Sequence, residues 1–213
     1  MMKRITFCAL LMTLFLLMSC NNSASSPKDG QAAKSDGTVI DLAKITNNIK
    51  EAVAFAKNVK DVHTLVKSID ELAKAIGKKI DANGLAADAN HNGSLIAGVY
   101  SVIEAVDTKL GTLGKVGLSS DLKAKVNATK TESAAFLTKI KGQNSDLGKD
   151  TASDAHVKNA IDKSDATGGK GKEELVKLNT AIDELLTSAE DAVTAAIKEL
   201  STPAKSASSA QSN

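Results

Sequence analysis

The chain has 213 residues with 27 basic and 25 acidic side chains, a formal net charge of +2 at pH 7. Arg4 is its only arginine, and because an electrostatic nucleic-acid binder shows a net basic domain and usually contacts bases through arginine, the composition weighs against nucleic acid as a partner. Aromatic residues make up 2% of the chain and tryptophan is absent. A core must therefore be built from Leu, Ile, Val and Ala, which pack well between interleaved helices.

The N-terminus has the layout of a secretory signal peptide, with an apolar run over residues 5–18 behind a basic start. The run is shorter than the ~20 residues that span a bilayer, and polar residues follow it. It closes in Leu17-Met18-Ser19-Cys20, which looks like a bacterial lipobox. We predict that the peptide 1–19 is cut off and that Cys20 carries both a diacylglycerol on sulfur and an acyl group on its amine. The alternatives are an ordinary signal peptide or an N-terminal membrane helix.

Removal of residues 1–19 changes what chemistry the mature chain can carry. It leaves 25 basic side chains (27 minus 2) against 25 acidic ones. Cys8 is lost with the signal peptide, so Cys20 is the only remaining cysteine, and lipidation makes it unavailable for a disulfide, thiol catalysis or a metal site. Residues 20–38 contain no large apolar side chain, which predicts a flexible tether between the lipid and the folded part.

The first folded element is predicted to be a helix from about residue 40 to residue 80, because apolar or small residues recur at steps of three and four. At 1.5 Å per residue such a helix would be roughly 60 Å long, which implies a rod-like bundle or a partner chain. A loop over 81–93 follows it. The predicted inward stripe is Leu42, Ile45, Ile49, Ala52, Ala56, Val59, Val62, Val66, Ile69, Ala73, Ile76 and Ile80.

Four further helices are predicted, over about 94–110, 121–141, 153–163 and 172–200. Three glycines between the first two of these break the helix and allow a short β-hairpin near 111–117. Either Ser119 or Ser120 can cap the 121–141 helix. The fold class is therefore all-α, an elongated antiparallel bundle of about five helices over 39–201, followed by a low-complexity tail over 202–213. The predicted inward residues are Leu95, Ile96, Val99, Ile103, Val106, Leu110, Leu122, Val126, Phe136, Leu137, Ile140, Val157, Ile161, Leu175, Leu178, Ile182, Leu185, Ala189, Val193, Ala196 and Leu200.

Nothing in the sequence indicates catalysis. His63, His91 and His156 are dispersed and have no thiolates to complete a zinc site. Adjacent acidic pairs splay apart on a helix, and no Gly-Lys pair has the spacing of a phosphate-binding loop. We therefore expect no catalytic residues, no cofactor and no metal. A periplasmic enzyme on the same anchor is the remaining alternative, and it would need a pocket of converging polar groups.

Four segments carry a resemblance to a known family: Ile40-Asp41-Leu42-Ala43-Lys44-Ile45-Thr46, Val62-His63-Thr64-Leu65-Val66-Lys67-Ser68-Ile69-Asp70-Glu71-Leu72, Ser94-Leu95-Ile96-Ala97-Gly98-Val99-Tyr100 and Gly169-Lys170-Gly171-Lys172-Glu173-Glu174-Leu175. Together they resemble the variable small proteins of relapsing-fever Borrelia, relatives of outer surface protein C. The resemblance implies a lipid-anchored protein of the outer membrane that faces the exterior, an elongated helical bundle that is often dimeric, and a role in antigenic variation. Cys20 corresponds to the lipidated cysteine of the family, which offers no catalytic residues.

The expected function is therefore that of a surface antigen exchanged for sister versions, so that host antibodies raised against one version miss the next. Loops over 81–93, 142–149 and 162–171 can vary at little energetic cost. A long apolar stripe that the shorter helices cannot cover predicts a homodimer. The alternative function is an adhesin for sulfated glycosaminoglycans, against which stands a mixed-charge solubilising face. Its contacts would be Lys123, Lys125, Lys130, Lys139, Lys141, Lys163, Lys170 and Lys172.

Overall fold

A computed structural model describes residues 31–33, 39–115 and 119–200. The chain divides into two compact units, Met1–Ala43 with Pro203–Asn213, and Lys44–Thr202. The predicted signal peptide, Cys20 and the tail over 202–213 lie outside the described residues. In the first unit, strand β1 (Gln31–Ala33) pairs antiparallel with β2 (Val39–Asp41). Residues 31–33, which lie within the predicted flexible tether over 20–38, are thus paired in a strand.

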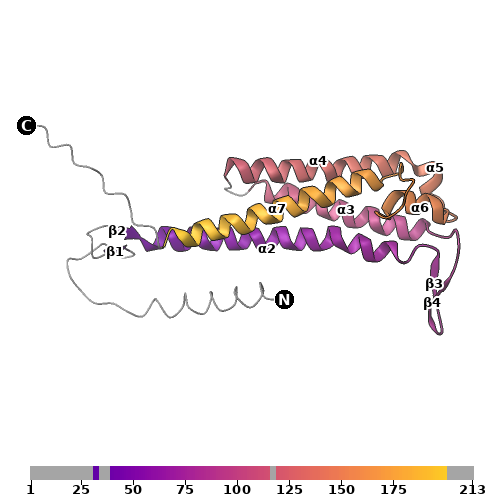
Figure 1. Cartoon of the computed structure of the whole chain (residues 1–213), viewed down its shortest axis with the longest axis horizontal. Coiled ribbons are helices and arrows are strands. Elements are labelled where there is room, and N and C mark those ends of the chain that lie inside the picture. Colours follow the sequence, from indigo (N-terminus) through magenta and orange to yellow (C-terminus); the bar gives the residue numbers. More distant parts are fainter. Residues whose placement is uncertain (1–30, 34–38, 116–118, 201–213) are drawn as a thin grey trace, which may run out of the picture. The chain divides into compact units, whose positions relative to one another are not determined.

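The second unit is an antiparallel helical bundle, which confirms the predicted fold class (Figure 1). Six helices lie within the described residues instead of about five, because a single turn, α5, forms in a stretch predicted to be irregular. The helices are α2 (Leu42–Ala73), α3 (Gly93–Leu113), α4 (Ser120–Gly142), α5 (Asn144–Leu147), α6 (Asp154–Ile161) and α7 (Lys172–Lys198).

Side-chain contacts show how the long helices are aligned. The amide of Asn48, near the start of α2, lies 3.2 Å from the carboxylate of Glu199, just after α7. Further along, His63 of α2 lies 2.9 Å from Asp183 of α7. The residue numbers of the contacts rise along α2 and fall along α7, so the two helices run antiparallel. The hydroxyl of Thr129 contacts the carbonyl of Ala181 at 3.3 Å, and Lys125, one turn earlier, contacts Glu184 at 3.3 Å, so α4 also runs antiparallel to α7.

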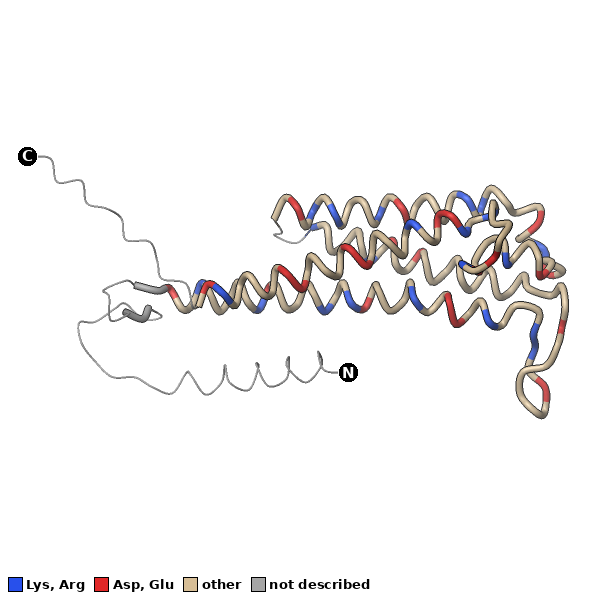
Figure 2. Tube along the Cα trace, in the orientation of Figure 1, with Lys and Arg blue, Asp and Glu red and all other residues tan. Residues whose placement is uncertain are grey.

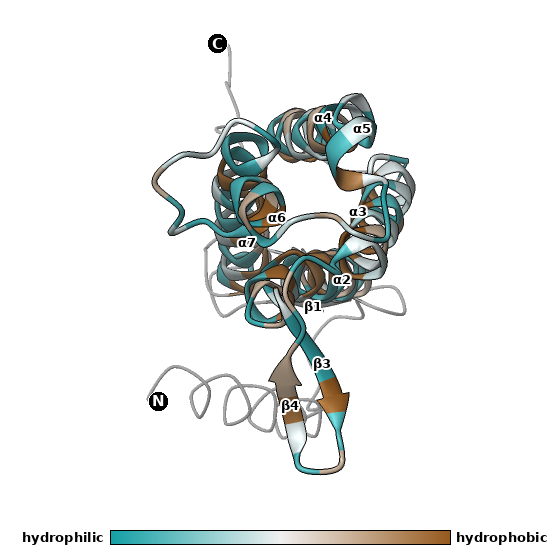
Figure 3. Ribbon diagram, turned by 90° about the vertical axis from the view of Figure 1, so that its right-hand side faces the viewer, coloured by the Kyte–Doolittle hydropathy of each residue, from teal (hydrophilic) through white to brown (hydrophobic). Residues whose placement is uncertain are grey.

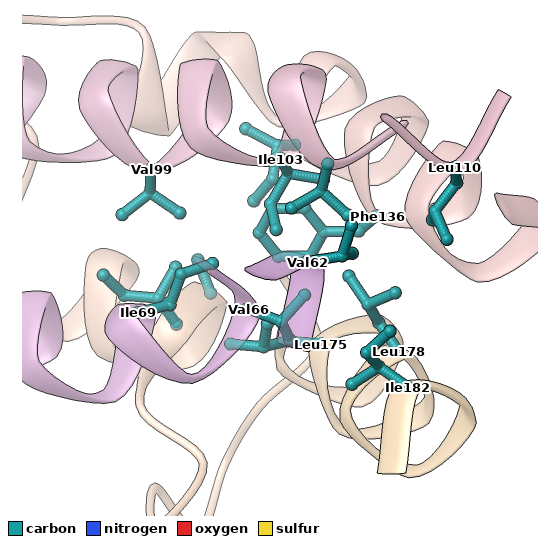
Figure 4. Close-up of a cluster of buried hydrophobic side chains, with 14 of the residues drawn as sticks. Val62, Val66, Ile69, Val99, Ile103, Leu110, Phe136, Leu175, Leu178 and Ile182 are labelled. Carbon is teal, nitrogen blue, oxygen red and sulfur yellow. The ribbon is translucent and has the colours of Figure 1, made fainter. Parts of the chain in front are cut away.

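The core lies mainly along the inner faces of α2, α3, α4 and α7, and most of its members belong to the periodic stripes read from the sequence, although Phe55 is buried outside the predicted stripe of α2. Phe136 of α4 is the largest fully buried side chain. Figure 4 shows it among aliphatic side chains of the neighbouring helices, including Val62 of α2 and Ile103 of α3. The 121–141 helix begins as predicted, because the Ser119 hydroxyl accepts a hydrogen bond from the N–H of Leu122 at 3.3 Å.

The first long helix ends earlier than predicted. α2 stops at Ala73, and Gly77 adopts a left-handed φ of 69°, which an L-residue rarely tolerates. Two strands follow, β3 (Lys78–Asp81) and β4 (Gly84–Ala87), which form an antiparallel hairpin where a helix end and a loop were expected. Ile80 was predicted to face inward but is 82% exposed on β3. Leu42, at the other end of the predicted stripe, is 38% exposed.

The described part of residues 111–117 forms no hairpin, contrary to the prediction. Residues 111–113 belong to the last turn of α3, and the rest of that stretch reaches residues outside the described range. Leu113 is 4% exposed. Its burial continues the apolar face of α3 by one step beyond Leu110, which favours helix despite the glycine at position 111. Tertiary packing thus outweighs the low helix propensity of that glycine.

Candidate functional site

The eight lysines predicted as glycosaminoglycan contacts are largely occupied within the chain. Basic and acidic residues are interspersed along the described helices (Figure 2). Five of the eight have close internal acceptors, which reduces the charge they can offer to a ligand. The pairs are Lys125 with Glu184 (3.3 Å), Lys130 with Asp107, Lys163 with Asp70 (2.8 Å), Lys170 with Asp146 (2.6 Å) and Lys172 with the carbonyl of Asp165 (2.6 Å).

The other three, Lys123, Lys139 and Lys141, make no side-chain hydrogen bond or ion pair with the described residues. Lys123 and Lys141 lie near opposite ends of α4, about 27 Å apart at 1.5 Å per residue. The hydrogen bond from the Gly169 N–H is the main cause that lowers the pKa of Glu173, and the charges of Lys172 and Lys139 add to it. Lys170 lies 3.1 Å from Gln143, the residue after α4, and thus near the end of α4 that carries Lys139 and Lys141, whereas Lys123 and Lys125 lie near its start.

A compact polar junction, which was not predicted from the sequence, joins the segment after α2 to the starts of α3 and α6. Its centre is Asn92, which is 2% exposed. The Asn92 side-chain oxygen accepts from the N–H of Gly77 at 2.8 Å, and its amide donates to the carbonyl of Ala152 at 3.0 Å and to the carboxylate of Asp154 at 2.8 Å. Every hydrogen-bonding group of this buried amide is thus engaged between distant segments. The only sequence signal was Asn90-His91-Asn92-Gly93, in which Asn-Gly favours a turn.

Asp154 supplies the charge at this junction. Its carboxylate accepts from the N–H of Asn90 at 2.8 Å, and its own N–H donates to the side-chain oxygen of Asn90 at 3.1 Å. Asn90 has a left-handed φ of 63° that this reciprocal pair holds in place. The hydrogen bonds from the backbone of Asn90 and the side chain of Asn92 hold the pKa of Asp154 below its ordinary 3.8. The junction fixes the loop between the β3–β4 hairpin and α3.

Acid should weaken this junction. Because the pKa of Asp154 is lowered in the folded state, its stabilising contribution is complete above 3.8 and is lost as the pH falls through the folded value. At neutral pH, Asp154→Ala should reduce the free energy of unfolding by about 1–2 kcal/mol, a modest figure because the carboxylate is partly exposed. Urea titrations at about pH 7 and about pH 3 should show the gap to wild type narrowing in acid.

The matched control is Asp191→Ala, which removes an exposed aspartate of α7 that has no ion pair or side-chain hydrogen bond with the described residues. Its unfolding midpoint should stay within about 0.5 kcal/mol of wild type at both pH values. A pH-independent loss in the Asp154 variant would contradict the role of its charge.

Each histidine lies beside an aspartate. His63, His91 and His156 are 2.9, 3.4 and 3.7 Å from Asp183, Asp88 and Asp146 respectively. Partial burial disfavours the ionised form of Asp183, but the hydrogen bond and charge of Lys67 and the contact with His63 outweigh it, so its pKa lies below the ordinary 3.8. Within the described ranges, no group of three or more His, Cys, Asp or Glu residues could hold a metal ion. His63 thus links α2 to α7 and His156 links α6 to α5, whereas His91 and Asp88 lie in the same loop before α3.

Two further observations concern cavities and membranes. A groove of about 540 Å³ lies between α3 and the corner of α4 and α5, and Ile96, Tyr100, Lys141 and Leu147 are among its lining residues. Its lining residues include no histidine or cysteine, and its polar side chains include Ser94, Ser101 and Asp150. Among residues 31–33, 39–115 and 119–200, no helix has the length and apolar character needed to cross a bilayer.

A protein-family model described as Lipoprotein matches residues 39–206 of this chain. The chain belongs to this lipoprotein family. Variable small protein 11 of Borrelia hermsii is similar at 49% identity over 212 residues, 97% of this chain and 100% of that relative. Outer surface protein C of Borreliella burgdorferi is 43% identical over 206 residues, 95% of this chain and 96% of that protein.

The fold is shared as well. The solved structure of Variable Small Protein 1 of Borrelia turicatae matches with a TM-score of 0.72 and 67% sequence identity, covering 75% of this chain and 98% of that one. The resemblance seen in the four sequence segments is thereby confirmed. The relatives of this chain thus include an outer surface protein.

Proposed function

We propose that this chain is an outer-membrane lipoprotein, anchored through Cys20 and displayed to the exterior as a variable surface antigen. The observation that carries the proposal is its 49% identity to Variable small protein 11 along 97% of the chain. Such coverage extends beyond the helical bundle toward both ends of the sequence. The lipobox-like Leu17-Met18-Ser19-Cys20 supplies the attachment chemistry.

The division between a buried apolar interior and exposed connecting segments suits a surface antigen. An apolar interior built by α2, α3, α4 and α7 holds the fold, while exposed residues of the connecting segments contribute little to that interior. Substitutions at such exposed positions usually change stability by less than about 0.5 kcal/mol. Sister versions can therefore differ where antibodies bind while the bundle is retained. This supports antigenic switching as the means of evading host immunity.

The predicted homodimer belongs to the same proposal. α2 has 32 residues, whereas α3 has 21 and α4 has 23. The two shorter helices therefore run beside only part of α2. The start of α2 contacts α7, and the other sides of this stretch have room for a second copy. Sedimentation of the unlipidated chain at high concentration should show dimers. A strict monomer at high concentration would contradict the dimer without affecting the anchor.

The anchor and the display are tested together on living cells. Brief protease treatment of intact cells should remove the bundle, and mass spectrometry of the mature N-terminus should find acyl and diacylglycerol groups on Cys20. Cys20→Ser should shift the protein from the membrane fraction to the soluble fraction, because no acceptor thiol remains. A periplasmic protein that survives the same protease treatment is the control for membrane integrity.

Each arm has an outcome that contradicts the proposal. Protection of the chain in intact cells, with degradation only after lysis, would place it in the periplasm. An N-terminus without fatty acids would remove the anchor. An antiserum raised against this chain that bound sister versions equally well would leave antigenic switching without a basis.

A further inference from the structure

The β3–β4 hairpin is an exposed apolar element at the end of the bundle where α2 ends. Figure 3 shows it projecting away from the helices, with apolar residues on both strands. Ile80 is 82% exposed and Leu85 is 66% exposed, the two highest values among the large hydrophobic residues of the described ranges. The two residues face each other across the strands. Exposed apolar side chains that cluster in this way typically mark an interaction surface.

The hairpin is held firmly at its base. The N–H of Asp88 donates to the carbonyl of Gly77 at 2.8 Å, and the N–H of Gly77 donates to buried Asn92 at 2.8 Å. The Lys79 ammonium lies 3.6 Å from the Asp88 carboxylate. These contacts connect both strands to the polar junction of Asn92 and Asp154. Because the hairpin is already ordered, it loses little conformational entropy when a partner binds to it.

The outer edge of β3 is open to pairing. A two-residue turn separates Asp81 from Gly84, so these two residues form the hydrogen-bonded pair that closes the hairpin. Hydrogen-bonded and non-hydrogen-bonded pairs alternate in an antiparallel ladder, which makes Lys79 the next residue bonded to β4. Ile80 therefore directs its N–H and C=O away from β4, and all four residues of β3 are exposed. This edge can therefore form backbone hydrogen bonds with an additional strand.

The charges along β3 select the partner. An antiparallel pair of β3 strands centred on Ile80 places Ile80 opposite Ile80 of the second copy. The same register places Lys79 opposite Asp81 twice, once on each side of the two-fold axis. Opposite charges directly across a ladder stabilise the pair. The sequence Lys-Lys-Ile-Asp is thus complementary to itself in this register, as a symmetric interface requires.

We propose that β3 is a self-pairing edge, through which the hairpins of two copies of this chain join into a four-stranded antiparallel sheet. The alternative register that keeps the same hydrogen-bonding pattern, centred one residue earlier, places Lys79 opposite Lys79 and is disfavoured by like charge. The β4 edge, Gly-Leu-Ala-Ala, has no charged residue to set a register. The interface is distinct from the helical faces of the proposed homodimer.

Such a short edge gives a weak contact in dilute solution. It becomes effective where copies are concentrated, as they would be if the proposed lipid anchor confines them to one membrane. The inference itself does not need the anchor, so it is tested on the unlipidated chain from residue 20 onward with Cys20→Ala. This form retains every described residue. Its outcome is therefore separate from that of the surface-display experiment.

Disulfide capture tests the register. In this cysteine-free background, Ile80→Cys should give a covalent dimer under mild oxidation, because opposed residues of a hydrogen-bonded antiparallel pair have Cα atoms about 5.5 Å apart, within disulfide reach. Leu85→Cys is the matched control, since it is a large exposed residue of the same hairpin on the other edge. Equal capture of the two variants, or no capture of the Ile80→Cys variant, would overturn the proposal.

Charge exchange tests the partner. With Ile80→Cys present, Lys79→Asp alone or Asp81→Lys alone should reduce capture by about fivefold to tenfold, because each variant opposes like charges twice. An equal mixture of the two variants should restore capture as a mixed dimer, since the two acidic positions of one copy then face the two basic positions of the other. A hairpin damaged by the substitutions would not recover on mixing. Failure to recover would overturn the register.

The same variants distinguish a lipid surface as the occupant. Vesicles of phosphatidylcholine with phosphatidylserine are mixed with the unlipidated chain and separated by flotation. If the chain floats, if Ile80→Asp abolishes flotation, and if the Ile80→Cys variant forms no covalent dimer, the exposed face binds lipid and the proposed pairing is wrong. Covalent capture of the Ile80→Cys variant without flotation supports pairing between copies.

Discussion

Phe136→Ala should reduce the free energy of unfolding by about 3–5 kcal/mol, the largest stability loss expected from a single truncation in this chain. The ring is fully buried on α4, among side chains of the neighbouring helices (Figure 4). Truncation removes its apolar contacts and leaves a cavity that helices held by many other contacts cannot fully close. Guanidinium denaturation followed by circular dichroism measures the loss.

Thr138→Ala is the matched control, because Thr138 is exposed on the same helix two residues later. It should change stability by no more than about 0.5 kcal/mol. If Phe136→Ala cost less than about 1 kcal/mol, the ring would not be part of a close-packed core, and the central position of α4 in the bundle would have to be revised.

Gly93→Ala should destabilise the chain by about 2–3 kcal/mol or more, although alanine favours helices and Gly93 is the first residue of α3. A Cβ atom at this position would lie 2.9 Å from the Cα of Asp150 and closer still to the carbonyl oxygen of Lys149. Both are backbone atoms, so no side-chain rotation relieves the clash. The N–H of Gly93 also donates to the carbonyl of Asp150 at 3.3 Å, and separating the segments would lengthen this bond.

Gly98→Ala, five residues later on the same helix, is the matched control. No heavy atom lies within 4 Å of a Cβ built there, so only helix propensity changes and stability should rise by about 0.5–1 kcal/mol. Thermal unfolding of the two variants should therefore move the midpoint in opposite directions. A rise for both would show that the 149–150 backbone does not approach α3 as closely as described.

The helices were predictable because burial repeats along a helix with the period of its turns. Phe136 and Ile140 are buried one turn apart on α4, and Leu178, Ile182 and Leu185 follow the same spacing on α7. Ser119 could be named as a cap for a similarly local reason, since its hydroxyl bonds to an N–H three residues away. Such features depend on neighbours within about one turn, which the sequence contains.

Ile80 shows how the same pattern fails. It stands four residues after Ile76, so it continues the stripe of α2, yet it lies on β3 and is 82% exposed. The helix ends because Gly77 takes a left-handed conformation held by Asn92, a residue fifteen positions away. The spacing of apolar residues contains no information about a contact between residues so far apart in the sequence. The hairpin was therefore missed, and residues 81–93 were predicted to be a loop.

By itself, the sequence determined the helical class, the apolar faces and the membership suggested by four segments and confirmed by the family match. It also supplied the motif at Cys20 from which the anchor is proposed. Only the tertiary structure decided which lysines are engaged, where the hairpin projects, and that Asn92 and Asp154 close a polar junction. The reason is distance along the chain: Lys163 meets Asp70 across 93 positions, and only packing of the helices brings such partners together.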